Sequence, residues 1–188
     1  MPNKPVALIL AAGSGRRFGS DKRRATGPWH GPLLHHVLGL YRPLFSTLGV
    51  VIGPDDAFGE EACRFFSAHP LVNPDAGQGM GTSLARGAEW LIEQGADCAV
   101  IGLADMPWIR PETIAAVAAE GLRSGRAVAP SFDGKPGFPR ALPAALLPNL
   151  LALTGDRGAA TIIDWRQALW LDGEDPGILR DIDRPEDI

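Results

Sequence analysis

The sequence alternates between short, continuous apolar runs and longer segments in which apolar residues recur at the helical period. Four runs, at 6–10, 48–52, 98–103 and 127–130, have the length of strands that are buried on both faces. Helical spacing occurs at 33–41, 58–66, 83–94 and 111–124. Because strands that are apolar throughout must be covered on both sides, the alternation predicts a mostly parallel sheet with helices on each face.

The pattern changes after position 131. Segment 133–139 is rich in turn-forming residues and is expected to reach out from the sheet. Segments 146–153 and 159–165 have helical spacing, and 168–171 and 178–182 are expected to be short strands. We find no repeat or linker that divides the chain, so the sequence predicts a single α/β domain over residues 1–188.

Composition excludes several classes of protein. With 18 basic and 22 acidic residues, the net charge of −4 argues against a nucleic-acid binder. No apolar stretch approaches the roughly 20 residues that a membrane span needs. The two cysteines, Cys63 and Cys98, stand in apolar contexts, which indicates buried free thiols, a reducing compartment and a cytoplasmic protein.

The charge is distributed unevenly along the chain. Five basic residues and a single acid, Asp21, lie between Arg16 and Arg24, whereas seven acids and two arginines lie between Asp172 and the last residue. The basic segment directly follows a glycine-rich loop at 11–15, whose small residues let backbone N–H groups approach an anion. The loop could need its glycines only to turn, but the basic residues behind it favour phosphate.

The loop matches neither of two familiar nucleotide-binding patterns. No Gly-Lys-Ser/Thr follows at the distance that a P-loop requires. The dinucleotide fingerprint requires a glycine at position 18, which is Phe18, and an NAD-dependent oxidoreductase is therefore disfavoured.

Five segments, in order along the chain, resemble the molybdenum cofactor nucleotidyltransferases, specifically their cytidylyltransferase branch. The segments are 10–19 with Lys22, 73–84, 102–107, 153–158 and 181–187. The resemblance implies a Rossmann-like three-layer α/β/α sandwich with a mostly parallel central sheet. It also implies transfer of a nucleotidyl group from a nucleoside triphosphate to a phosphate, with release of pyrophosphate. Ala12 stands where guanylyltransferase relatives usually have glycine, which favours CTP, and the implied acceptor is molybdopterin.

The implied chemistry needs cations rather than a general base, because the nucleophile is already an anionic phosphate oxygen. The four histidines form no catalytic constellation. By resemblance, Arg17 and Lys22 would hold the β- and γ-phosphates. Asp105 follows the buried run 98–103, where open α/β sheets bind ligands, and its carboxylate suits Mg²⁺. The alternative is that Asp105 only caps the turn before Pro107.

A second carboxylate for Mg²⁺ would come from Asp181 or Asp183. We expect only one of them, Asp183, to reach the metal. The remaining acids of the tail are expected to be a solvated surface. The five tryptophans show no stacking pattern and are expected to pack in the core or at its rim.

The remaining predicted contacts divide between nucleotide and acceptor. The nucleotide set comprises Leu10, Ala11, Ala12, Gly13, Gly15, Asn73, Gly79 and Ser83, and the acceptor set comprises Gly137 and Pro139. The acceptor loop reads Gly137-Phe138-Pro139 where the cytidylyltransferases usually have Gly-His-Pro, and Arg23 and Arg24 stand where relatives usually have leucines. The nucleotide half therefore matches the family better than the acceptor half.

Two other functions remain open. One is a guanylyltransferase or sugar-phosphate nucleotidyltransferase on the same fold. The other is a non-catalytic nucleotide- or cofactor-binding chaperone for molybdoenzyme maturation, with a molybdoenzyme as its transient partner. The motif residues Arg17, Lys22 and Asp105 argue for turnover, and the altered acceptor loop argues for the chaperone.

Overall fold

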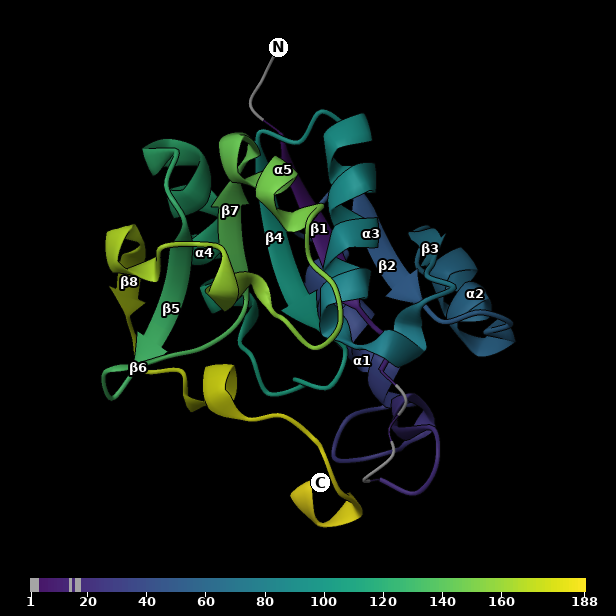
Figure 1. The fold of residues 1–188 in the computed structure, drawn as a ribbon. Coiled ribbons are helices and arrows are strands. Elements are labelled where there is room, and N and C mark those ends of the chain that lie inside the picture. Colours follow the sequence, from purple (N-terminus) through teal and green to yellow (C-terminus); the bar gives the residue numbers. More distant parts are fainter. Residues whose placement is uncertain (1–3, 14, 16–17) are drawn as a thin grey trace.

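The computed structural model describes residues 4–13, 15 and 18–188. The strands of this part of the chain form one twisted eight-stranded sheet (Figure 1). Its strands are β1 (Pro5–Leu10), β2 (Leu48–Ile52), β3 (His69–Val72), β4 (Cys98–Leu103), β5 (Val128–Phe132), β6 (Lys135–Pro136), β7 (Arg140–Pro143) and β8 (Leu169–Asp172). The strand order is β3-β2-β1-β4-β7-β5-β6, and β8 pairs with β5. Strands β1 to β4 and the pair β5–β8 are parallel, whereas β7 runs antiparallel to both of its neighbours.

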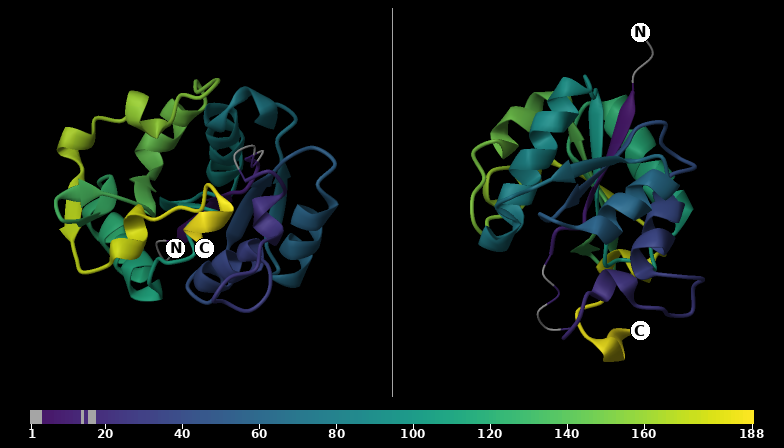
Figure 2. Two further views of the ribbon diagram at one scale, coloured as in Figure 1. Left: turned by 90° about the horizontal axis from the view of Figure 1, so that it is seen from below. Right: turned by 90° about the vertical axis from the view of Figure 1, so that its right-hand side faces the viewer.

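Helices cover both faces of the sheet, as the edge-on view in Figure 2 shows. Helices α1 (Leu33–Tyr41), α2 (Ala57–Phe65) and α4 (Pro111–Ser124) pack on one face, where they meet Ala7 and Ile9 of β1. Helices α3 (Met80–Glu93) and α5 (Leu147–Leu150) pack on the other face, where they meet Val6 and Leu8. Successive side chains of β1 thus enter two separate cores, and the predicted three-layer α/β/α sandwich with a mostly parallel sheet is confirmed.

The four apolar runs predicted as strands all become strands of the sheet, with small shifts at their ends. The edge strand β3 and the reversed strand β7 lie in segments that sequence patterning left unassigned. Segment 133–139 forms a hairpin with β5 through β6, so it pairs with the sheet edge instead of reaching away from it.

The expected strand at 178–182 is absent, and the expectation was wrong. This part of the chain holds a 3-10 turn, Pro176–Leu179, followed by extended backbone without a strand partner. The backbone N–H of Ile182 instead donates to the carbonyl oxygen of Asp105 at 2.9 Å. This segment therefore has a hydrogen bond to a loop where a strand would have a ladder of hydrogen bonds to a neighbouring strand. The bond holds the C-terminal segment across the end of β4.

Both cysteines are free and buried, as predicted. Burial raises the pKa of the Cys98 thiol to about 12 and that of Cys63 to about 11, and nearby carboxylates add to both shifts. Within the described residues, no helix has the length and apolar character that crossing a bilayer requires.

Candidate active site

A cleft of about 530 Å³ opens at the carboxyl ends of β1 and β4. The chain leaves β1 toward β2 on one side and reaches β4 on the other, so the cleft lies at a switch point of the sheet, where α/β proteins bind ligands. Its lining comes from the ends of these two strands, from five connecting segments and from the start of α3. The lining residues are Leu10, Ala12, Gly13, Ala76, Gly77, Gln78, Gly79, Met80, Ser83, Leu103, Asp105, Asp156, Asp181 and Asp183.

Three carboxylates meet at one end of this cleft. Asp105, Asp181 and Asp183 each offer an oxygen atom, and these atoms all lie within 4.8 Å of one another. We call these three residues the acidic cluster. Asp105 follows β4, and the hydrogen bond from the Ile182 N–H to the Asp105 carbonyl brings the two tail aspartates beside it.

Lys22 is the cation that faces the acidic cluster. Its Nζ donates to Asp105 Oδ2 at 2.7 Å and to the carbonyl of Ile182 at 2.8 Å, and it lies 3.5 Å from Asp183 Oδ1. The second oxygen of Asp105, Oδ1, is buried and has no hydrogen-bond partner among the described residues. A buried carboxylate oxygen without a donor is costly unless a cation approaches it, so the donor set fits a hard divalent ion.

The expectation that only one tail aspartate reaches the cluster does not hold, because both Asp181 and Asp183 contribute oxygens. The Ile182 N–H that bonds to the Asp105 carbonyl holds the backbone between them against the end of β4. The other tail acids are also not all solvated. Asp175 is buried and accepts from the Arg110 N–H and the Thr113 hydroxyl, and Asp187 accepts from two backbone N–H groups.

The residues of the basic segment behind the first loop have different roles. Arg23 turns away from the cleft and binds both Asp21 and Asp56, and its Nη1 donates to the carbonyl of Ala11 at 3.1 Å. We call Arg23, Asp21 and Asp56 the arginine clamp. Burial lowers the pKa of Arg23, but the hydrogen bonds and charges of the two aspartates outweigh it and raise that pKa.

Arg24 does not contact the acidic cluster. Arg24 lies over the Phe58 ring, 4.1 Å from its centroid. Arg16 and the predicted phosphate ligand Arg17 lie outside the described residues. Lys22 is therefore the one side chain of this segment that the described structure directs at the acidic cluster.

Some predicted contacts of the first loop line the cleft, and others hold the loop in place. Leu10, Ala12 and Gly13 line the cleft as predicted contacts should. Ala11 is buried, and its N–H donates to the carbonyl of Val51 at 2.9 Å, so it anchors the loop. Gly15 has a φ of +56°, which favours glycine, and its carbonyl accepts from the Phe18 N–H, but it is not part of the lining.

The second predicted loop also divides into lining and support. Ser83 and Gly79 line the cleft. Asn73 is buried outside the lining, and its amide donates to the hydroxyls of Thr82 and Ser83, both at 3.0 Å. Gly79, with φ +123°, packs so closely against Gly155 and Asp156 that a Cβ would collide with them. Asn73 therefore positions the loop, and Gly79 lets a further loop approach.

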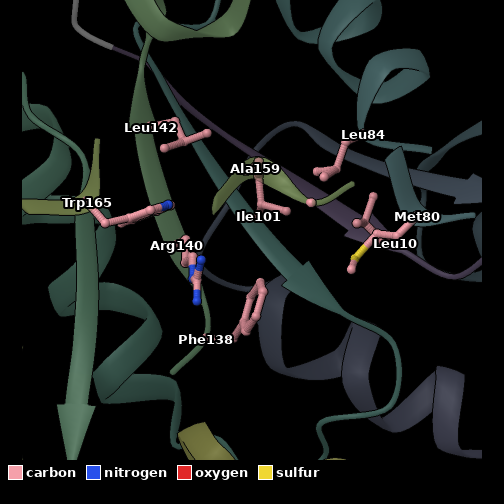
Figure 3. A pocket seen from close by; sticks show the side chains of 10 residues that line it. Leu10, Met80, Leu84, Ile101, Phe138, Arg140, Leu142, Ala159 and Trp165 are labelled. Atoms are coloured by element: carbon pink, nitrogen blue, oxygen red, sulfur yellow. The ribbon is translucent and has the colours of Figure 1, made fainter. Parts of the chain in front are cut away.

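A smaller cavity of about 220 Å³ adjoins the cleft and shares Leu10 and Met80 with it (Figure 3). We call it the Trp165 pocket. It lies on the α3 and α5 face, since paired residues Ile101 of β4 and Arg140 of β7 both enter it. The lining residues are Leu10, Met80, Leu84, Ile101, Phe138, Arg140, Leu142, Gly158, Ala159 and Trp165.

The predicted acceptor residues Gly137 and Pro139 line neither the cleft nor the Trp165 pocket. A Cβ on Gly137 would collide with the carbonyl of Ile178, so this glycine serves packing. Their neighbours Phe138 and Arg140 line the pocket in their place.

Sequence reasoning also missed other lining residues. Asp156 lies in a segment that carried the resemblance, so a signal existed for it, and Asp181 was considered but passed over in favour of Asp183. Trp165 was expected only to pack, and nothing in the pattern singled out Arg140.

The fold is that of the nucleotidyltransferases. The chain superimposes on "A nucleotidyl transferase from Methanothermobacter thermautotroptrophicus" with a TM-score of 0.78 and 21% identity, covering 98% of this chain and 94% of the other. A manganese complex of Rv0371c from Mycobacterium tuberculosis superimposes with a TM-score of 0.77 and 22% identity, covering 98% and 95% of the two chains. Identities this low establish the shared fold alone.

Sequence comparison then identifies the family. The model of the "MobA-like NTP transferase domain" matches residues 7–169, and the chain belongs to this family. Purine catabolism protein PucB of Bacillus subtilis is 31% identical over 97% of this chain and 93% of its own length. Matches to other relatives cover less of those proteins.

Two such relatives show how partial the coverage is. A "Probable molybdenum cofactor guanylyltransferase" of Mycobacterium avium is 30% identical over 58% of this chain and 53% of its own length. The bifunctional protein GlmU of Granulibacter bethesdensis is 35% identical over 60% of this chain, but the match spans only 24% of that protein.

Proposed function

We propose that this protein is a Mg²⁺-dependent nucleotidyltransferase that moves CMP from CTP to the phosphate of a molybdopterin-type acceptor and releases pyrophosphate. One observation carries the proposal. The buried, unpartnered Oδ1 of Asp105 belongs to a cluster of three carboxylates that faces Lys22 in the cleft. The glycine-rich loop after β1 lines the same cleft.

The reaction forms a bond between an acceptor phosphate oxygen and the α-phosphorus of the nucleotide. The bond between that phosphorus and the oxygen that bridges to the β-phosphate breaks, and pyrophosphate leaves. Repulsion between anions dominates the barrier, so positioning and positive charge supply the catalysis. Lys22 would neutralise the leaving pyrophosphate, and Arg17 would join it there.

Asp105, Asp181 and Asp183 would hold the metal, since carboxylate oxygens are the ligands that Mg²⁺ prefers. A bound divalent ion supplies charge neutralisation at the phosphates and polarises the phosphorus. The structure of Rv0371c as a manganese complex is consistent with use of a divalent ion by this fold. The hydroxyl of Ser83 and the backbone of Gly77 and Gly79 would contact the base and ribose.

The choice of base rests on Ala12, which lines the cleft and adds a methyl group where guanylyltransferase relatives usually have glycine. The name of the Mycobacterium avium relative makes GTP the direct competitor of CTP in this proposal. The proposed cytoplasmic location follows from the two buried free thiols, which suit a reducing compartment.

The test is release of pyrophosphate from each nucleoside triphosphate in turn, with purified molybdopterin, in the presence and absence of Mg²⁺. We expect turnover with CTP and Mg²⁺ together, and none when either is left out. Preference for GTP would overturn the cytidylyl assignment alone. No release from any nucleoside triphosphate would overturn the transferase proposal and favour the cofactor-binding chaperone.

Asp105→Asn tests the observation that carries the proposal. The amide keeps the shape of the side chain and removes its charge, so metal-dependent turnover should fall by about 10²-fold or more. Glu93→Gln, at an exposed position near the end of α3, is the matched control and should retain full activity. Full turnover of Asp105→Asn would show that the metal binds elsewhere.

A further inference from the structure

The Trp165 pocket differs from the cleft in that almost all of its walls are apolar. Figure 3 shows Leu10, Met80 and Leu84 on one side, Leu142, Arg140 and Trp165 on the other, and Ile101 between them. Because the pocket shares Leu10 and Met80 with the cleft, one elongated molecule can occupy both. A volume of about 220 Å³ suits a body of one or two fused rings.

Arg140 carries a charge into this apolar pocket without a counterion. Its guanidinium lies 4.7 Å from the Phe138 ring centroid and 4.5 Å from that of Trp165. In the described part of the chain, its one hydrogen bond is from Nε to the carbonyl of Gly137, at 3.4 Å, and no carboxylate forms an ion pair with it. Burial lowers the pKa of this guanidinium, as expected when a charge loses water and gains no partner.

A second group in the pocket also lacks a partner. The indole Nε1 of Trp165 is buried and donates no hydrogen bond to any described residue. In Figure 3 the ring of Trp165 extends toward Arg140 and Leu142 with its nitrogen leading. Buried donors in folded proteins are almost always paired, so the unpartnered Trp165 Nε1 beside a guanidinium without a carboxylate indicates that the pocket receives an acceptor atom from a ligand.

We propose that the Trp165 pocket binds the organic body of the acceptor substrate, a planar ring system bearing an anionic oxygen that Arg140 and Trp165 Nε1 recognise. This inference rests on the proposed transferase function, because it divides the substrates between the cleft and the pocket. The nucleotide occupies the cleft, and the acceptor reaches from the pocket past Leu10 and Met80 to present its phosphate. The aromatic rings favour a flat ligand that can stack on them, and the forked guanidinium favours an anion. Together they favour a flat anion over a sugar.

The first test measures binding by isothermal titration calorimetry with two probes, pterin-6-carboxylate and uncharged pterin, which differ by one carboxylate. We expect the wild type to bind the carboxylate more tightly, and Arg140→Gln to weaken its binding by about tenfold or more. Arg140→Lys, which keeps the charge but not the fork, should recover part of the affinity. Arg123→Gln, at an exposed arginine of α4, is the matched control and should bind as the wild type does.

The second test separates the two substrates kinetically. Arg140→Gln should raise the KM for the acceptor by about tenfold or more while the KM for the nucleotide stays within about twofold. A rise in the KM for the nucleotide alone would place the base in this pocket and overturn the proposal. Equal binding of both probes by wild type and Arg140→Gln would overturn it as well. If the wild type binds the carboxylate through Arg140 but releases no pyrophosphate from any nucleotide, the transferase assignment fails while the anion pocket stands.

Discussion

The acidic cluster and the arginine clamp each set aspartates against a cation, and the two cations, Lys22 and Arg23, are consecutive residues. In the clamp, one guanidinium meets two carboxylates, and its fork satisfies both of them. At the cluster, the Lys22 ammonium meets two of three carboxylates, those of Asp105 and Asp183, and a buried oxygen of Asp105 is left without a donor. The clamp is therefore complete by itself, whereas the cluster has capacity for a further cation.

This difference shows why a basic segment cannot be interpreted as a whole. Partly buried charges that are paired, as in the clamp, stabilise the loop that they hold, because either sign alone would be costly. An unbalanced cluster in a cleft is available for ligands. The clamp fixes the backbone at Ala11, and so it supports the loop that lines the cleft.

The largest expected effect comes from Lys22→Met. Turnover should fall by about 10²- to 10³-fold, because the variant lacks the charge that neutralises the leaving pyrophosphate. The three carboxylates would then face one another without Lys22, so added Mg²⁺ should raise the Tm more than it does in the wild type. Pyrophosphate release and thermal melts with and without Mg²⁺ measure both effects. Turnover within twofold of the wild type would show that Lys22 does not act on the phosphates.

Arg23→Met should lower the stability of the protein and leave turnover nearly unchanged, the opposite of Lys22→Met. The change leaves Asp56, which is nearly buried, without its cation and costs about 2 kcal/mol, between the values for exposed and fully buried ion pairs. For a domain of this size, that loss lowers the Tm by roughly 4–8 °C, while turnover of the folded fraction should stay within a few-fold. Arg24→Met, at the more exposed neighbour, is the control and should hardly change the Tm. A catalytic loss like that of Lys22→Met, with an unchanged Tm, would contradict the division between clamp and cluster.

The smallest expected effect is the pH dependence of the clamp. Burial raises the pKa of Asp21, but the hydrogen bonds and charge of Arg23 outweigh it, and the pKa is lowered from its ordinary 3.8. A carboxyl with a lowered pKa in the folded state stabilises the protein above its unfolded pKa, and this contribution is lost as the pH falls through the folded value. The pKa of Arg23 is raised, so its charge persists throughout this range.

The difference in Tm between the wild type and Arg23→Met should therefore shrink as the pH falls from about 5 toward 2.5. Thermal melts at a series of pH values measure it. A difference that stays constant over this range would show that the clamp stabilises the protein by packing rather than by charge.

Much of the cleft, the proposed nucleotide site, could be predicted from the sequence. Asp105 was found because an apolar run marks β4, and the residue after a central strand lies where ligands bind. A basic segment behind a glycine-rich loop favoured phosphate there, and the family resemblance singled out Lys22 within that segment. Asp181 was passed over in favour of Asp183, although the hydrogen bond from the Ile182 N–H to the Asp105 carbonyl brings both aspartates to the cluster. Local patterning carries no information about such distant partners.

The acceptor side was predicted less well, for a topological reason. Arg140 enters the Trp165 pocket because β7 inserts antiparallel between β4 and β5 and pairs Arg140 with Ile101. A four-residue strand has too few alternations to be recognised, and its register depends on a partner nearly forty positions away. Trp165 reaches the same pocket from a 3-10 turn that has no distinctive pattern.

The sequence by itself determined the layers of the sheet and its helices, the position of the glycine-rich loop and the placement of Asp105 at a strand end. These follow from hydrophobic periodicity and strand length, which act over neighbouring residues. The tertiary structure decided which charged side chains are fully paired with an opposite charge and which are not. Arg23 is paired with Asp56, which caps the start of α2, Asp105 keeps an oxygen without a partner, and Arg140 lies against two rings without a carboxylate. Whether a charge finds a partner depends on contacts between distant segments, and only the folded chain brings those segments together.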